Sequence, residues 1–391
     1  MRNELEYLEL AKRNIDNNGV GDPTNFLALS NASYGLAKIL YIQDYLGFEQ
    51  NAFFISAPDF TITRNNPRWL SGFSYGGMLI WGDGNVPLMI LDPRPNTCGI
   101  LVGGFFELPS LSKMIENIDS IIEEQCPKGS LWDFTRRNHF FTIFKTTNTS
   151  KKDIYPYIFF LHGNPDAIKR DSEDLPGLYL EKSTWLQQNC TRIETPFGNI
   201  HILLEEDAKY YLEFYLKHEN YSRIYREKTA KSILGNYTPI SNETHQGLVN
   251  LNQLVLGCYL APMKTILPFS ISMTEDAYLI TPKITMQEIL KSSNLKKRIT
   301  DLFSYSLDQY SLLPHGSGYT TPHVKEIKKI KMINGKRYYV LNMGKNKTKL
   351  IISNISEIPF EYRRKNGYFN VLEDYYFNIH STLRPIYSFR V

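Results

Sequence analysis

The sequence has no uninterrupted hydrophobic run that approaches the roughly 20 residues needed to cross a bilayer. Residues 1–6 are too acidic and contain too few apolar side chains for a secretory signal. The four cysteines lie far apart, without a Cys-x-x-Cys pair, which argues against both a disulfide framework and a zinc ribbon. We therefore expect a protein of the reducing cytoplasm with no membrane partner.

The chain also lacks a strong excess of either charge. Its 44 basic residues nearly balance its 40 acidic residues, which leaves a formal charge of +4. Sequence-independent binding of nucleic acid rests on lysines and arginines that neutralise phosphates, so an RNA partner here would need a local basic groove. No internal repeat divides the sequence, and its length suffices to bury a large core. The length allows either one large domain or two smaller ones.

Hydrophobic periodicity gives a coarse outline of the elements. Apolar residues at helical spacing predict helices over residues 1–50, 111–125, 207–234 and 241–258, the last of which would place Cys258 in the core. Runs of aromatic and β-branched residues predict strands from residue 53 onward, over 140–144, 157–161 and 199–204, and in a hairpin of 338–343 with 349–353. Residues 166–195 read as a polar, irregular excursion.

The segment 311–319 is the starting point for a functional interpretation. His315 is followed there by Gly-Ser-Gly, and because glycine has no Cβ, the backbone can bend sharply and let a phosphate approach closely. A neutral imidazole in such a loop is a plausible nucleophile near neutral pH. The alternative is a partly exposed histidine in an ordinary Pro-x-Gly-x-Gly loop.

Three other side chains fall at turns or strand ends. Cys98 ends a turn-rich segment, His139 begins one predicted strand, and His162 ends another. Thiolate and imidazole ligands suit Mn²⁺, Fe²⁺ or Zn²⁺, and three protein ligands with open positions are typical of a catalytic metal. The alternative is one buried thiol and two unrelated histidines, because sequence spacing does not show that the three converge.

Several short motifs occur along the chain in a distinctive order. They are Ala-Pro-Asp at 57–59, Thr-Cys-Gly at 97–99, Asn-His-Phe at 138–140, Leu-His-Gly at 161–163, His-Gly-Ser-Gly at 315–318, and residues 383–390, which start with Leu-Arg. In this order they resemble the motifs of the RtcB-type RNA ligases, whose nucleophile element is His-Gly-Ala-Gly. The resemblance covers nearly the whole chain. It implies a single large mixed α/β domain of the RtcB type, of the α+β class, over residues 1–391, with a central metal-binding cleft.

The resemblance also implies a role for each matching residue. Cys98, His139 and His162 would bind manganese, and Asn138 would hold the guanylate. His315 would attack the α-phosphorus of GTP, with Asp59 as a positioning carboxylate. The remaining nucleotide-binding residues would be Gly316, Ser317, Gly318 and Arg390, the last standing where the family has a guanine-contacting lysine.

The chain departs from the family pattern at several ligand positions. Pro95 stands three residues before Cys98, where the family has a metal-binding aspartate, and Asp92 is the carboxylate that could substitute. Residues 262–285 contain no match for the family's late metal histidine, and Tyr319 replaces the arginine after Gly-x-Gly. Because at least two ligands of a two-metal site are missing, we expect one ion.

The leading hypothesis is a divergent RNA ligase that depends on GTP and manganese. It would join an RNA 3′-phosphate, or 2′,3′-cyclic phosphate, to a 5′-hydroxyl through a histidine–guanylate intermediate, and its partners would be the ends of tRNA-like or cleaved RNA. One alternative is a catalytically inactive relative that binds RNA or a protein, and another is a metal-dependent phosphoesterase. The basic segment 325–337 is either a solvated face or the lip of an RNA groove.

Overall fold

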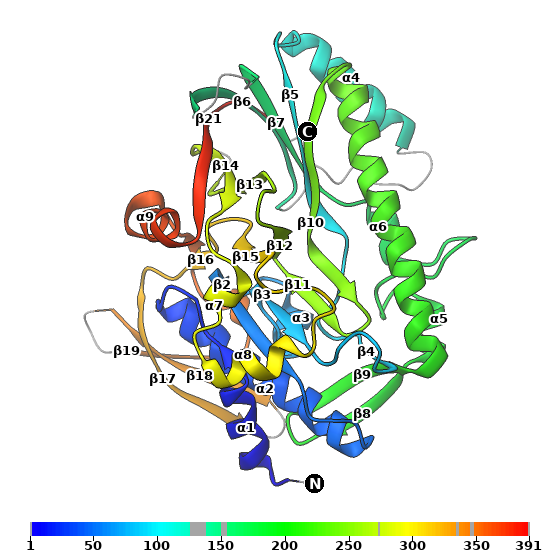
Figure 1. The fold of residues 1–391 in the computed structure, drawn as a ribbon, viewed down its shortest axis with the longest axis vertical. Coiled ribbons are helices and arrows are strands. Elements are labelled where there is room, and N and C mark those ends of the chain that lie inside the picture. The colour runs from blue at the N-terminus through cyan, green and yellow to red at the C-terminus, as the bar shows by residue number, and fades with distance from the viewer. Residues whose placement is uncertain are drawn as a thin grey trace.

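The computed structural model describes residues 2–125, 138–149, 155–272, 274–333, 336–344 and 348–389. Its main feature is an 11-stranded sheet in the order β1-β2-β3-β11-β10-β5-β7-β6-β21-β14-β13. Neighbouring strands are antiparallel except β1 and β2, which run parallel. The protein is therefore a mixed α/β structure built on one large sheet (Figure 1).

The strands of the large sheet are β1 (Ile15–Asp16), β2 (Phe53–Thr61), β3 (Tyr75–Ile80), β5 (Cys98–Phe105), β6 (Phe140–Thr149), β7 (Tyr157–Gly163), β10 (Thr238–Asn250), β11 (Gln253–Leu256), β13 (Leu267–Ser270), β14 (Ala277–Pro282) and β21 (Phe377–Phe389). Smaller sheets are formed by β4 (Leu88–Ile90), β9 (Gly198–Leu204) and β8 (Thr191–Thr195); by β12 (Cys258–Pro262) and β15 (Tyr310–Pro314); by β16 (Tyr319–Thr320) and β20 (Glu361–Tyr362); and by β17 (Val324–Ile333), β18 (Lys336–Met343) and β19 (Thr348–Ile352). The helices are α1 (Glu4–Arg13), α2 (Pro23–Tyr45), α3 (Asn66–Leu70), α4 (Leu111–Gln125), α5 (Thr184–Asn189), α6 (Glu205–Leu234), α7 (Met286–Ile289), α8 (Ser293–Thr300) and α9 (Lys365–Tyr375), with short 3₁₀ turns at η2 (Asp166–Lys169) and η3 (Ile355–Glu357).

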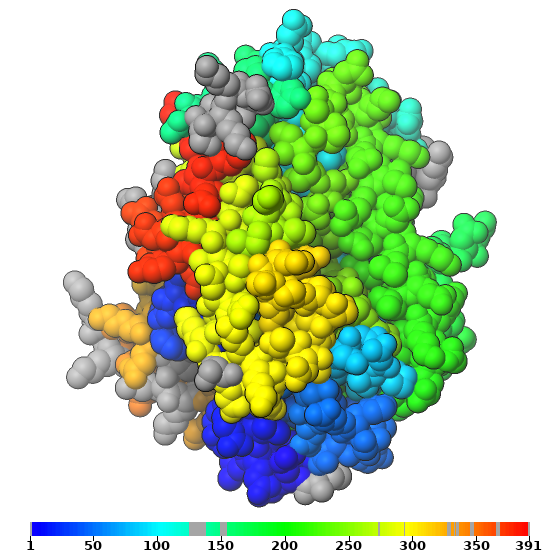
Figure 2. Space-filling view, in the orientation of Figure 1, coloured from blue at the N-terminus to red at the C-terminus, as the bar shows by residue number. Residues whose placement is uncertain are grey.

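Strand β2 shows why the sheet lies inside the molecule. All nine of its residues are buried, because successive side chains of a strand point to opposite faces and both faces are covered. Phe54 and Phe60 pack in a cluster with residues of α2, whereas Phe53 and Ile55 pack on the opposite face against α7 and α8. In Figure 2 the yellow segment that includes α7 and α8 lies at the surface, in the lower half of the view.

The other half of the sheet is covered by the long helix α6, which runs beside β10 and β5 (Figure 1). Leu101 and Leu161 of the sheet pack there with Ile233 of α6 and Met114 of α4. Helix α4 begins where the sequence predicts, since the Ser110 hydroxyl accepts a hydrogen bond from the backbone N–H of Lys113 at 3.2 Å. This packing fixes strands β5, β6 and β7, whose ends carry the candidate metal ligands.

The structure confirms most of the predicted helices and strands, including α2, α6, β7 and the hairpin of β18 with β19. The predicted helix over 241–258 is wrong, because that segment forms the end of β10, then β11 and the start of β12. Because both faces of this sheet are covered, apolar residues occur on both faces of the strand instead of at every second position. Their spacing therefore resembles that of an amphipathic helix. Residues 166–195 are also more regular than predicted, since they contain α5 and β8.

Candidate functional site

One pocket brings together nearly all of the residues singled out in the sequence. Its lining includes Asp59, Cys98, Asn138, His139, His162, His315, Gly316, Ser317 and Gly318. These residues come from positions up to 259 apart in the chain, so only the fold can assemble them. Arg390, the remaining predicted nucleotide contact, lies outside the described residues.

The candidate metal ligands come from adjacent strands of the large sheet. Cys98 begins β5, His162 lies near the end of β7, and His139 directly precedes β6. Strand β7 pairs with both of the others, with His162 opposite Ile100 on one side and Phe140 on the other. The register of the sheet therefore gathers the three side chains at one place, where paired strands hold them with little freedom.

The distances within this group fit a single ion. The Sγ atom of Cys98 lies 3.4 Å from Nε2 of His139 and 3.2 Å from Nε2 of His162, and all three ligand atoms lie within 4.8 Å of one another. A tetrahedral ion with ordinary metal–sulfur and metal–nitrogen bonds separates such atoms by about 3.5 Å. Cys98, His139 and His162, all buried, could thus hold a metal ion.

Hydrogen bonding fixes the orientation of His162. Its Nδ1 lies 2.9 Å from the backbone carbonyl oxygen of Asn138, so Nδ1 carries the proton and donates it. The Nε2 lone pair consequently points toward Cys98, as metal-ligating imidazoles require. Asn138 thus supports the candidate centre through its main chain, in addition to lining the pocket with its side chain.

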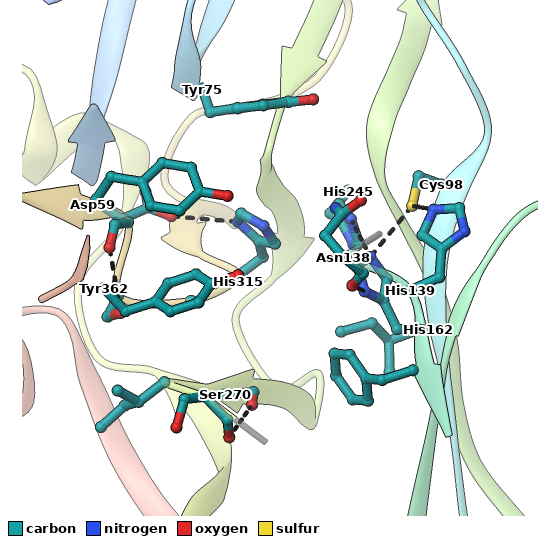
Figure 3. A pocket seen from close by; sticks show the side chains of 18 of the residues that line it. Asp59, Tyr75, Cys98, Asn138, His139, His162, His245, Ser270, His315 and Tyr362 are labelled. Carbon is teal, nitrogen blue, oxygen red and sulfur yellow. Dashed lines mark hydrogen bonds and ion pairs between the residues drawn. The ribbon is translucent and has the colours of Figure 1, made fainter. Parts of the chain in front are cut away.

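His245, which the sequence analysis missed, lines the same pocket beside this group. Its Nε2 lies 3.2 Å from Nε2 of His162, and its Nδ1 is buried without a hydrogen-bond partner. The register between β10 and β5 shifts between Thr244 and Gln246, which makes His245 the extra residue of a β-bulge. Bulges re-aim side chains at functional sites, and here the bulge sends the imidazole toward Cys98 and His162 (Figure 3).

The ionisation of the group suits metal binding. Burial alone would raise the pKa of Cys98, but the imidazoles of His162 and His139 hold it well below its ordinary value. Burial lowers the pKa of His162, although Cys98 opposes that shift, and burial together with the charge on His315 lowers the pKa of His245 to about 3, against the opposing effect of Cys98. The lowered pKa of the Cys98 thiol favours the thiolate, which is the form of cysteine that binds a divalent transition metal.

The donor atoms also bear on the identity of the ion. The group that could hold an ion among the described residues contains sulfur and nitrogen ligands and no carboxylate. Asp92, the carboxylate that might have replaced the missing aspartate, instead accepts hydrogen bonds from the backbone N–H of His201 at 2.6 Å and from its imidazole, and it does not line the pocket. The donor set fits a divalent transition metal, and softer ions such as Zn²⁺ or Co²⁺ fit it better than Mn²⁺, which prefers oxygen ligands.

His315 lies across the pocket from Cys98. Its ring stacks on that of His245, with centroids 4.6 Å apart and planes 27° apart, and its Nδ1 lies 3.2 Å from Oδ2 of Asp59. Asp59 is 1% exposed, and its carboxylate is placed to accept a hydrogen bond from Nδ1–H, which in a neutral imidazole puts the lone pair on Nε2. Figure 3 shows the resulting row of side chains from Asp59 through His315 and His245 to Cys98. The pocket thus places an imidazole held by a carboxylate on the side opposite a group that could hold a metal ion.

From the sequence, we expect the glycines after His315 to allow the close approach of a phosphate. In the structure, the missing side chains leave room for the backbone of neighbouring segments of the protein. A Cβ on Gly316 would lie 2.9 Å from the carbonyl oxygen of Ser270, and one on Gly318, whose φ is +70°, would lie 2.5 Å from that of Asp59. Arg363 joins the same segments, since its guanidinium donates to the carbonyl oxygens of Asp59 at 3.0 Å and Ser317 at 3.2 Å. The loop is therefore fixed relative to β2, which supplies Asp59.

The rest of the pocket lining is aromatic and hydroxyl-rich. Tyr319, at the position of the missing arginine, stacks on Tyr362 with ring centroids 5.1 Å apart. The other aromatic rings and hydroxyl groups of the lining are those of Tyr75, Phe140, Thr61, Ser270, Ser272, Thr274 and Ser317. No lysine or arginine of the described chain lines the pocket. A bound metal ion would thus supply much of the positive charge that an anionic ligand needs.

Comparison with the profiles of known protein families finds no match for this sequence, and a comparison with curated proteins finds none either. Within the part of the chain that the structure describes, none of the helices combines the length and the apolar character that a membrane crossing requires.

Proposed function

We propose that this chain is a divergent relative of the RtcB-type RNA ligases that uses His315 to accept a guanylate from GTP. The observation that carries the proposal is the shared pocket of His315, its carboxylate partner Asp59, and the Cys98, His139 and His162 group. A nucleophile and a metal centre in one cleft are the parts that nucleotidyl transfer requires. The motif order along the chain supports the same reaction.

In the proposed reaction, Nε2 of His315 attacks the α-phosphorus of GTP. A nitrogen–phosphorus bond forms while the bond to the bridging oxygen of pyrophosphate breaks, and pyrophosphate leaves. An RNA 3′-phosphate oxygen then displaces His315 from the guanylate, and a 5′-hydroxyl attacks the activated 3′-phosphorus and releases GMP. Asp59 would hold the Nδ1 proton throughout, so that Nε2 stays available.

The metal ligands of this chain would be Cys98, His139 and His162, with His245 as a further candidate. An ion bound there would neutralise charge on the phosphate oxygens, a role that no lysine or arginine of the described pocket lining can fill. Manganese is the ion that the family resemblance implies, whereas the donor atoms favour a softer one. The aromatic rings of Tyr319 and Tyr362 offer surfaces on which a nucleobase can stack.

The proposal is tested by incubating the purified protein with GTP labelled at the α-phosphate, in parallel with Mn²⁺, Co²⁺, Zn²⁺ or a chelator. We expect a covalent label on the protein that is lost in acid, as a phosphoramidate is, and that requires a metal ion. Absence of label from folded protein with bound metal would contradict the ligase proposal. Phosphate release from a phosphoester without GTP would then favour a phosphoesterase, and its absence an inactive RNA- or protein-binding relative.

The small sheet of β17, β18 and β19 is the surface that we propose for an RNA partner. Its inner face packs Tyr339 and Leu341 into the core, so the alternating residues Tyr338 and Asn342 face outward. Lys331 lies opposite Tyr338, Lys349 lies opposite Asn342, and both lysines are exposed. A sheet face with lysines around a tyrosine is suited to phosphates and stacked bases of single-stranded RNA.

We therefore expect the double variant Lys331→Glu, Lys349→Glu to bind single-stranded RNA more weakly than the unmodified protein. Loss of two phosphate contacts should also flatten the plot of log affinity against log salt concentration by roughly 0.7 for each contact. Fluorescence anisotropy with labelled oligonucleotides over a salt series measures both quantities. Lys113→Glu, on the exposed face of α4, is the control, and an unchanged slope in the double variant would exclude this sheet as the RNA surface.

A further inference from the structure

Arg226 lies on α6 behind the strands that carry the candidate metal ligands. It is fully buried, at 0% exposure. Its NH1 donates to the carbonyl oxygen of Thr97 at 3.2 Å and to that of Gly163 at 3.0 Å, and its Nε donates to Oδ1 of Asn242 at 2.8 Å. One guanidinium thus joins three segments of the large sheet.

Each of these partners is close in sequence to a metal-ligand candidate. Thr97 directly precedes Cys98, and Gly163 directly follows His162. Asn242 lies on β10, three residues before His245. The contacts of Arg226 therefore fix the backbone of β5, β7 and β10 beside the point where each strand supplies its ligand.

Gly99 explains how the guanidinium comes so close to the sheet. A Cβ at this position would lie 2.9 Å from NH2 of Arg226 and 2.5 Å from the carbonyl oxygen of Glu243. Any side chain would force the arginine and β10 away from β5. The glycine after Cys98 consequently belongs to the support of the centre.

Among the described residues, the hydrogen-bond partners of Arg226 are two backbone carbonyls and an amide, and none is a carboxylate. Its NH2 is buried without a hydrogen-bond partner. Burial lowers the pKa of Arg226 to about 10, and the charge on Cys98 acts to raise it, so the guanidinium stays protonated near neutral pH.

We propose that Arg226 is a positioning residue of the candidate metal centre, where it holds β5, β7 and β10, the strands of Cys98, His162 and His245, in register. The proposal rests on the metal centre invoked above but not on the ligase reaction. Partners behind metal ligands orient them and commonly change metal affinity 10–100-fold when lost. A lysine cannot replace the planar fork, because its ammonium cannot reach the three acceptors in the same geometry.

The test is cobalt binding to Arg226→Lys, measured by competition with a chelator and by the thiolate-to-cobalt charge-transfer absorption. We expect affinity to fall about 10–100-fold and the absorption band to shift or weaken, because the Cys98 sulfur no longer sits in the same geometry. Arg223→Lys is the matched control, since Arg223 lies three residues earlier on α6 but is 39% exposed and paired with Glu219 and Glu243. Circular dichroism and thermal unfolding check that both variants fold.

If Arg226→Lys fails to fold, Asn242→Ala provides the second measurement, because it removes one acceptor of the fork and leaves the arginine in place. We expect a smaller loss of cobalt affinity with a shifted band. The proposal would be overturned if Arg226→Lys bound cobalt with wild-type affinity and an unchanged absorption band. If Arg226→Lys does not fold, the same result in Asn242→Ala would overturn it. Failure of the unmodified protein to bind cobalt would overturn the metal centre itself and the proposal with it.

Discussion

Replacement of His315 by alanine is expected to abolish covalent incorporation of guanylate from GTP. Nε2 of His315 is the proposed nucleophile, and the other imidazoles of the pocket face Cys98 and one another instead of the open space. None of these other imidazoles is therefore placed to take over the bond to phosphorus. The measurement is retention of label from α-phosphate-labelled GTP on the denatured protein.

The variant Asp59→Asn keeps His315, the proposed nucleophile, but removes the carboxylate that orients its imidazole. The amide retains the size of the carboxylate but cannot hold the Nδ1 proton of His315 in the same way, so Nε2 spends less time unprotonated and correctly oriented. We expect labelling to slow by about 10²–10⁴-fold, the usual range for groups that manage a proton in a reaction, while metal binding stays unchanged. Full labelling of His315→Ala would show that another residue is the nucleophile and would contradict the proposed reaction.

Cys98→Ala is expected to abolish stable metal binding. Cys98 contributes the one thiolate of the group and touches both His139 and His162, so its loss removes a ligand and also the negative charge that favours the ion. The fall in metal affinity should exceed roughly 10–100-fold, which is the usual effect of removing a residue that only hydrogen-bonds to a metal ligand. Equilibrium dialysis against Co²⁺ or Zn²⁺, followed by elemental analysis, measures it.

Cys258→Ala is the matched control for this experiment. Cys258 is also a buried free thiol, but it lies in a different core cluster, where its thiol donates to the carbonyl oxygen of Gly77. Its replacement should leave the bound metal unchanged. Equal metal content in Cys98→Ala and Cys258→Ala would rule out the centre.

His245→Ala, in the same series, determines how many ions the pocket holds. His245 is close to His162 but lies on the His315 side of the group. A loss of affinity as large as that of Cys98→Ala would make it a ligand of the same ion. If the variant still binds one ion tightly but loses a second, more weakly bound ion, the pocket holds two ions.

The sheet explains how a centre of this kind can be rigid without a carboxylate. Strands β10, β5, β7 and β6 are consecutive neighbours, and each brings one of His245, Cys98, His162 and His139 to the same end of the sheet. Backbone pairing then fixes the ligands to within the tolerance that a metal imposes. The cleft forms where this end of the sheet faces the loop of His315 and β2, as Figure 3 shows.

The sequence by itself determined the elements whose pattern is local. The amphipathic period of residues 111–125 and the Ser110 cap predicted α4, and the aromatic run 157–161 predicted β7 with His162 at its end. The ordered motifs also selected Cys98, His139, His162 and His315, which the structure brings into one pocket. Local propensity and a motif are sufficient for such residues, because each can be recognised without knowing its spatial neighbours.

Only the tertiary structure decided the place of His245 and Arg226. His245 lies in a segment whose leucines imitate a helix, and a bulge in a sheet covered on both faces directs it into the site. In the sequence, Arg226 cannot be distinguished from the other basic residues of a long helix. Only the packing of that helix shows that Arg226 is buried against three strands. Both roles depend on contacts between residues distant in sequence, and such contacts leave no periodic signal in the chain.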